Sequence, residues 1–144
     1  MSGARDIPAA ARAESVLIQL ASVYMSVSKQ LEQKSKCSQT RGFVLSTLRG
    51  GAALNQNQIA VALGYDRTVV HRVVKSLARE GLVSETKAKT GKSILVQLTR
   101  KGNAYRERMI KIRRAADEKL HRTLSARDRT SLLRLLAAIE RVRF

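Results

Sequence analysis

A stretch near the middle of the chain places hydrogen-bonding and cationic side chains along one face of a predicted helix. These side chains recur at positions i, i+3, i+4, i+7 and i+11, and they are Thr68, His71, Arg72, Lys75 and Arg79. The opposite face is apolar, with Val70, Val73, Val74 and Leu77. Such a stripe packs against a core, so the polar face points outward. A helix with these two faces suits the major groove of DNA, and the plainer alternative is a helical hairpin whose charged face is merely solvated.

The surrounding residues predict that this helix is the second of a pair spanning residues 54–83. Asn55 followed by Gln58 resembles a capping box that opens the first helix. Gly64 can end that helix in a left-handed conformation, and Asp66 can cap the start of the second helix. The pair is therefore expected to form a helix-turn-helix.

After this pair the apolar pattern changes from helical to alternating. Residues 82–87 and 93–98 are predicted strands, and residues 88–91 form the turn between them. The face of the second strand that is expected to be buried carries Ile94, Val96 and Leu98. Lys87, Lys89 and Lys92 lie near the tip, so the hairpin is predicted to be a basic wing beside the helix. The alternative is an edge on which lysines prevent aggregation.

Longer helices are predicted on both sides of this central unit. Residues 10–33 should form one helix, with a seam of Leu17, Leu20, Tyr24, Val27 and Leu31. A shorter helix over residues 39–49 should bury Phe43, Val44 and Leu48 and end at Gly50 and Gly51. Thr99 can cap a helix that runs to about residue 123, and Ser125 with Asp128 can open a last one. The apolar residues of this last helix are Leu132, Leu135, Leu136, Ile139 and Val142.

Composition narrows the function classes. The chain has 144 residues, of which 44% are hydrophobic, so it is long enough for one folded domain. Lys and Arg total 28 against 11 Asp and Glu, giving a formal net charge of +17. This excess indicates a polyanionic partner, with nucleic acid favoured over an anionic membrane. Only 3% of residues are aromatic and none is Trp, which argues against a base-stacking platform.

Other classes lack their signatures. One Cys excludes an internal disulfide, no Cys/His cluster has metal-ligand spacing, and no catalytic constellation or phosphate loop is evident. We therefore expect no enzyme activity, no cofactor and no metal. There is no apolar run of membrane-spanning length and no signal-peptide pattern, so a cytoplasmic, soluble protein without membrane partners is expected.

Several motifs together resemble the MarR family of bacterial winged-helix transcription regulators. They are Leu54 to Leu63 with Gly64, Asp66 to Arg72, Leu77 with Gly81 to Val83, Leu98-Thr99 with Gly102, and Leu124-Ser125. The resemblance covers about residues 12–142. It implies a homodimer, joined by its terminal helices, that binds pseudo-palindromic double-stranded DNA and usually represses genes. Many members release DNA on binding a small, often phenolic or anionic aromatic effector.

The resemblance also assigns roles to residues. The side chains nearest the bases would be Arg67, Thr68, Val69, His71 and Arg72, with Lys75 toward phosphate. On the wing, Thr90 and Lys92 stand where the family usually has Asp and Arg, with Gly91 between them. Because Lys suits a narrow minor groove less well than Arg, the wing lysines are expected to hold phosphates.

For an effector pocket the resemblance suggests Tyr24, Arg41 and Phe43, each of which also has a core or surface explanation. A few family members sense oxidants through a thiol, but Cys37 stands where the family usually has an apolar residue such as Leu. A buried structural role is therefore expected for Cys37. His121 is expected at the surface or in the dimer contact.

The predicted fold class is mainly α with a small β-hairpin, a winged helix-turn-helix core flanked by N- and C-terminal dimerisation helices. Residues 1–9 would be a flexible tail and residues 10–144 a single domain. Within it, residues 39–98 would bind DNA, while residues 10–33 and 99–144 would form the dimer. The predicted function is that of a sequence-specific regulator, the effector-relieved repressor that the resemblance implies. The alternatives are a weakly specific architectural DNA-binding protein and a redox sensor acting through Cys37.

Overall fold

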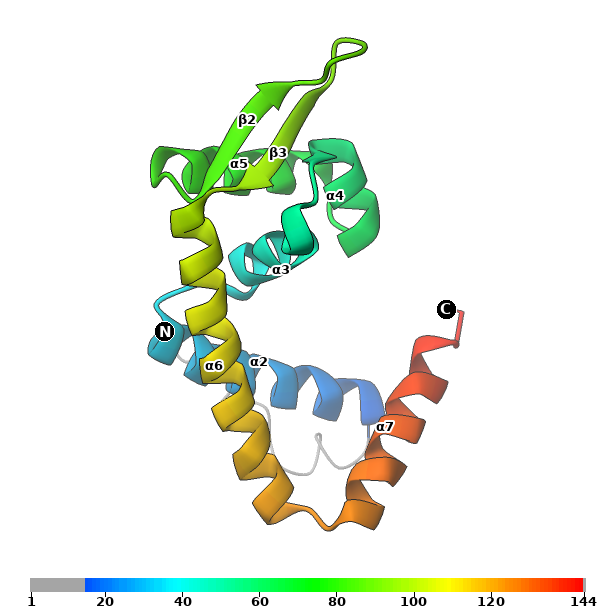
Figure 1. The fold of residues 1–144 in the computed structure, drawn as a ribbon. Helices are drawn as coiled ribbons and strands as arrows, with labels where there is room; N and C mark the ends of the chain where they lie inside the picture. The colour runs from blue at the N-terminus through cyan, green and yellow to red at the C-terminus, as the bar shows by residue number, and fades with distance from the viewer. Residues whose placement is uncertain (1–14, 144) are drawn as a thin grey trace. The chain divides into compact units, whose positions relative to one another are not determined.

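The computed structural model describes residues 15–143 and is mainly helical, as predicted (Figure 1). In chain order the elements are α2 Val16–Ser35, α3 Gln39–Thr47, the 3-10 helix η1 Arg49–Gly51, β1 Leu54–Asn55, α4 Gln56–Leu63, α5 Arg67–Arg79, β2 Val83–Lys87, β3 Ile94–Leu98, α6 Arg100–Thr123 and α7 Ala126–Glu140. They form two compact units, one up to Met109 and one from Ile110. The part of the predicted first helix before Ser15 lies outside the described residues.

The first unit contains the hydrophobic core that positions α5. Fully buried side chains come from four elements, and they include Leu45 of α3, Ile59 of α4, Val70, Val74 and Leu77 of α5, and Val96 of β3. The apolar face of α5 predicted from its spacing is thus confirmed, with Val73 half-buried beside the cluster. Burial of this face leaves the polar face of α5 exposed.

The helix boundaries of the central pair follow the local signals in the sequence. Asn55 and Gln58 form a reciprocal capping box, with bonds of 2.9 Å in each direction. Gly64 ends α4 with φ +65°, and the carboxylate of Asp66 accepts the Thr68 N–H at 2.6 Å. This bond lowers the pKa of Asp66. Thr99 and Ser125 cap α6 and α7 in the same way, as predicted.

The sheet differs from the prediction by one strand. β2 and β3 form the expected antiparallel hairpin, but β1 pairs with the other edge of β3, Leu54 opposite Val96. A strand of two residues is too short to give an alternating pattern, so the sequence does not reveal it. Of the predicted inward face, Val96 is fully buried whereas Ile94, next to the turn of the hairpin, is 48% exposed.

Smaller corrections concern helix ends and one buried set. α3 ends at Thr47, because Gly50 and Gly51, with φ of +67° and +77°, belong to the separate turn η1. Its fully buried residues are Val44 and Leu45, Leu48 directly after the helix is also fully buried, and Phe43 is half-buried. α7 ends at Glu140, so Val142 lies beyond the helix.

The hairpin is anchored where it meets α6. Thr99 donates its N–H to the carbonyl of Leu82 at 3.1 Å, and its hydroxyl donates to the carbonyl of Gly81 at 2.7 Å. A Cβ at Gly102 would lie 1.8 Å from the Leu82 carbonyl oxygen. Only glycine permits this approach, so Gly102 fixes the base of the hairpin against α6.

Among residues 15–143, no helix combines the length and apolarity that a bilayer span requires.

Candidate DNA-binding surface

The candidate surface consists of the polar face of α5 and the neighbouring hairpin. We call the hairpin from Val83 to Leu98 the wing. β2 packs on α5, so the base of the wing lies against that helix, and the tip extends away from it (Figure 1). The predicted residues of α5 are exposed except Val69, which is half-buried; the exposed ones are Arg67, Thr68, His71, Arg72 and Lys75. All three wing lysines, Lys87, Lys89 and Lys92, are exposed as well.

Two residues of this surface have partners that the sequence did not reveal. The ammonium of Lys75 donates to Glu85 Oε2 on β2 at 2.9 Å. The ring nitrogen Nδ1 of His71 lies 3.0 Å from Gln56 Oε1 on α4, and Gln56 Nε2 donates to Glu85 Oε1 at 3.4 Å. Lys75 is therefore not a free cation, which modifies its expected role toward phosphate. Gln56 and Glu85 join the candidate surface.

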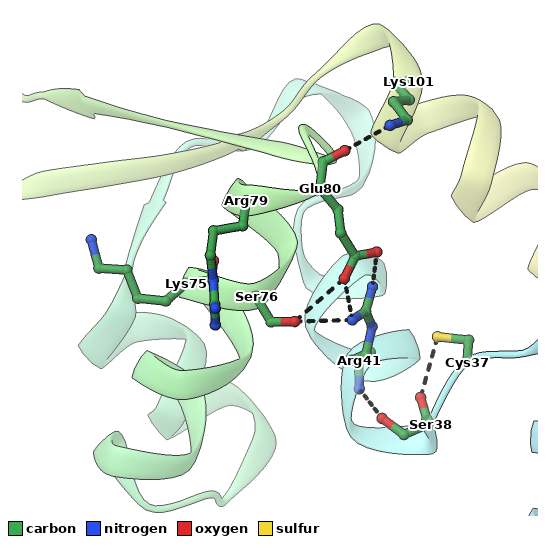
Figure 2. Close-up of polar contacts among 8 residues, drawn as sticks. All are labelled: Cys37, Ser38, Arg41, Lys75, Ser76, Arg79, Glu80 and Lys101. Carbon is green, nitrogen blue, oxygen red and sulfur yellow. Dashed lines mark hydrogen bonds and ion pairs between the residues drawn. The ribbon is translucent and has the colours of Figure 1, made fainter.

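The end of α5 is tied to α3 by an ion pair. Arg41 donates through both terminal nitrogens to the carboxylate of Glu80, each at 2.7 Å, and through Nη1 to Ser76 Oγ at 3.1 Å (Figure 2). The bidentate pair raises the pKa of Arg41 and lowers the pKa of Glu80. Arg41 Nε is buried without a hydrogen-bond partner among the described residues.

The three residues suggested for an effector pocket are not joined by hydrogen bonds in the described part of the chain. Arg41 and Phe43 lie on α3, where Arg41 is engaged with Glu80, and Tyr24 is 55% exposed on α2. Cys37 is 5% exposed, and its thiol donates to the Ser38 carbonyl at 3.4 Å (Figure 2). Cys37 is thus buried, as expected for a packing residue. The pKa of Tyr105 is raised, mainly because the side chain is partly buried and also because of a hydrogen bond with Cys37.

Within residues 15–143, no group of three or more His, Cys, Asp or Glu side chains is placed to hold a metal ion.

A helix-turn-helix followed by a β-hairpin, with the second helix exposed beside the hairpin, defines a winged helix-turn-helix lobe. A model of the MarR family matches residues 40–92, which run from α3 to the tip of the wing. The resemblance to the MarR family is therefore confirmed. No curated protein sequence matches the chain.

Solved structures of regulators share the fold. CouR, a transcriptional repressor bound to a 23-mer DNA duplex, has a TM-score of 0.83 at 24% identity, covering 94% of this chain and 99% of its own. The S. aureus MepR–DNA complex gives 0.79 at 19%, covering 87% and 95%. BpsR of Bordetella bronchiseptica, whose DNA binding is regulated by 6-hydroxynicotinic acid, gives 0.79 at 22%, covering 90% and 96%.

Proposed function

We propose that the protein is a dimeric, sequence-specific regulator of transcription that binds double-stranded DNA through α5 and the wing. The observation that supports this most directly is the exposed face of α5, which carries Arg67, Thr68, His71 and Arg72, while the opposite face buries Val70, Val74 and Leu77 completely. These side chains can form hydrogen bonds with the edges of bases in the major groove. The wing lysines can form ion pairs with phosphates. The net charge of +17 acts in the same direction.

Dimerisation is supported by apolar side chains that face water in the single chain. On α2, Val16, Leu17 and Val23 are 68%, 54% and 51% exposed. On α7, Leu133 and Leu135 are 68% and 51% exposed. Several large apolar side chains exposed on one helix indicate an interaction site. We assign both helices to the interface of a homodimer, which would present two copies of α5 to a pseudo-palindromic site.

Selection of binding sites from a random duplex pool tests the proposal. The expected result is a pseudo-palindromic consensus bound by a dimer in sedimentation, with random duplex bound much more weakly at the same salt concentration. A chain lacking residues 125–144 should lose the dimer and the tight binding. Equal affinity for consensus and random duplexes would favour the alternative, a weakly specific architectural DNA-binding protein, which the net charge also suits.

Repression relieved by a small anionic aromatic effector is the finer part of the proposal. BpsR is regulated by 6-hydroxynicotinic acid, and another structure of the same fold is CouR bound to p-coumaroyl-CoA. In this chain Arg41 is the candidate for an anion contact, because an anion that displaced Glu80 would alter the end of α5. Tyr24 and Phe43 remain the aromatic candidates.

A panel of aromatic carboxylates, scored by release of DNA, tests the effector. Arg41→Gln should abolish the response. Glu80→Gln is the matched variant: it keeps the guanidinium, so the effector should still bind in a direct titration, but the ion pair is already broken, so the effect on DNA release should be smaller. A response unchanged in Arg41→Gln would remove Arg41 from the effector site.

A further inference from the structure

Glu85, Gln56 and His71 form a chain of hydrogen bonds across three elements of the DNA-binding lobe. Gln56 Nε2 donates to Glu85 Oε1 at 3.4 Å, and Gln56 Oε1 lies 3.0 Å from His71 Nδ1. Glu85 also accepts from Lys75 at 2.9 Å and is 20% exposed, so its direction is fixed from two sides. Gln56 stands in the first turn of α4, next to the capping box.

The donor and acceptor roles in this chain follow from the ionised carboxylate at its end. A carboxylate only accepts hydrogen bonds, so the amide group of Gln56 must turn its NH₂ toward Glu85. The amide oxygen is then the atom that faces His71. An amide oxygen also only accepts, so His71 Nδ1 must carry the proton. Reversing the amide would place its oxygen against the carboxylate, which is repulsive.

A neutral imidazole protonated at Nδ1 has a bare Nε2, which is an acceptor. In the major groove, donors are offered by the amino groups of adenine and cytosine, while guanine and thymine present acceptors there. We propose that His71 accepts a hydrogen bond from the amino group of an adenine or cytosine, and that Gln56 and Glu85 are positioning residues that fix its tautomer. This rests on the proposed binding of DNA by the exposed face of α5.

Nitrogen-15 NMR of the imidazole rings tests the tautomer in the full-length protein without DNA, at a pH where both histidines are neutral. His71 should be protonated at Nδ1. His121 is an internal control, since no hydrogen bond of its ring is found among the described residues, and it should show the Nε2–H form that a free histidine side chain prefers. Gln56→Ala and Glu85→Gln should each move His71 toward the Nε2–H form. Asn57→Ala, the exposed neighbour, should not.

This spectrum can overturn the tautomer assignment directly. Wild-type His71 in the Nε2–H form would do so, as would a spectrum of His71 that neither variant changes. A merely structural role of Gln56 would alter stability without altering the His71 tautomer, so the two roles are distinguished.

The base contact is tested with the selected duplex. Each adenine is replaced in turn by purine and each cytosine by pyrimidin-2-one, which lack the major-groove amino group. At one position this replacement should weaken wild-type binding roughly 3- to 10-fold, the worth of one hydrogen bond. The same replacement should weaken binding of the His71→Ala variant much less. A double-mutant cycle that combines the base replacement with His71→Ala removes the effect of the replacement on the duplex itself.

The base contact of His71 and the binding of DNA by α5 can be overturned separately. A selected site with no position coupled to His71 would overturn the base contact while the proposed function stands. The lack of any selected site would overturn both, whatever the tautomer of His71.

Discussion

The exposed face of α5 and the tip of the wing are both basic, but their side chains have different surroundings. On α5, Lys75 is paired with Glu85 and His71 lies against Gln56. At the wing tip Lys87, Lys89 and Lys92 are exposed and make no ion pair within residues 15–143. Partners fix the direction of a side chain before DNA arrives, which suits contacts to base edges. Unpaired lysines keep their rotamer freedom and suit phosphates, which tolerate many geometries.

The largest effect should come from the anchor that both regions share. Gly102→Ala places a methyl group against the Leu82 carbonyl, at 1.8 Å without relaxation, so α6 and the base of the wing must separate. We expect the free energy of unfolding to fall by about 3 kcal/mol, the upper end for overpacking. Urea denaturation measures it. Asn103→Ala, the exposed neighbour on α6, is the control, and equal stability of the two variants would contradict the anchor.

The next largest effect should come from Arg72 and tests whether it contacts a base or a phosphate. Arg72 is exposed in the first half of α5 and has no ion pair among the described residues, so its position on the helix decides its role. Arg72→Ala should cost about 1 to 3 kcal/mol on the selected site and relax base preference at one position. Binding to selected and scrambled duplexes measures this. If both duplexes were bound more weakly by the same factor, Arg72 would be a phosphate contact.

The wing should behave in the opposite way. Lys92→Ala is expected to weaken selected and scrambled duplexes alike and to lower the salt dependence of log K by about 0.9 for each phosphate that is no longer neutralised. A salt series on both duplexes provides the measurement. If Lys92→Ala instead abolished discrimination between the duplexes, the wing would be a specificity element despite its lysine in place of the family's arginine.

The sequence predicted the parts of this comparison that depend on neighbours along the chain. The caps at Asn55, Asp66, Thr99 and Ser125 each join residues two or three apart, so type and spacing suffice to find them. The buried face of α5 was likewise predictable, because helical periodicity separates Val70 and Val74 from the polar residues between them.

The sequence could not predict which charges on the surface are paired. Gln56 meets His71 across 15 positions and Glu85 across 29, and Arg41 meets Glu80 across 39. Such contacts depend on how α3, α4, α5 and β2 pack, and no local spacing encodes them. The same holds for β1, whose two residues are a strand only because β3 lies beside them. The sequence therefore does not distinguish Lys75 from Lys92. Of these two, only Lys75 has a carboxylate partner among the described residues.

The smallest effect should come from breaking the ion pair between Lys75 and Glu85. Glu85→Gln removes the charge that pairs with Lys75, whose side chain is 48% exposed, so stability should change by no more than about 1 kcal/mol. The freed ammonium can then neutralise a phosphate, which should strengthen binding to scrambled DNA and raise the salt dependence by up to about 0.9. Discrimination should fall at the same time, because the tautomer of His71 is no longer fixed. Glu107→Gln is the matched control: it also breaks one surface ion pair and adds one unit of net charge, but on α6. If both variants strengthened binding to scrambled DNA equally, net charge alone would explain the gain. The pairing of Lys75 with Glu85 would then not distinguish the DNA contacts of α5 from those of the wing.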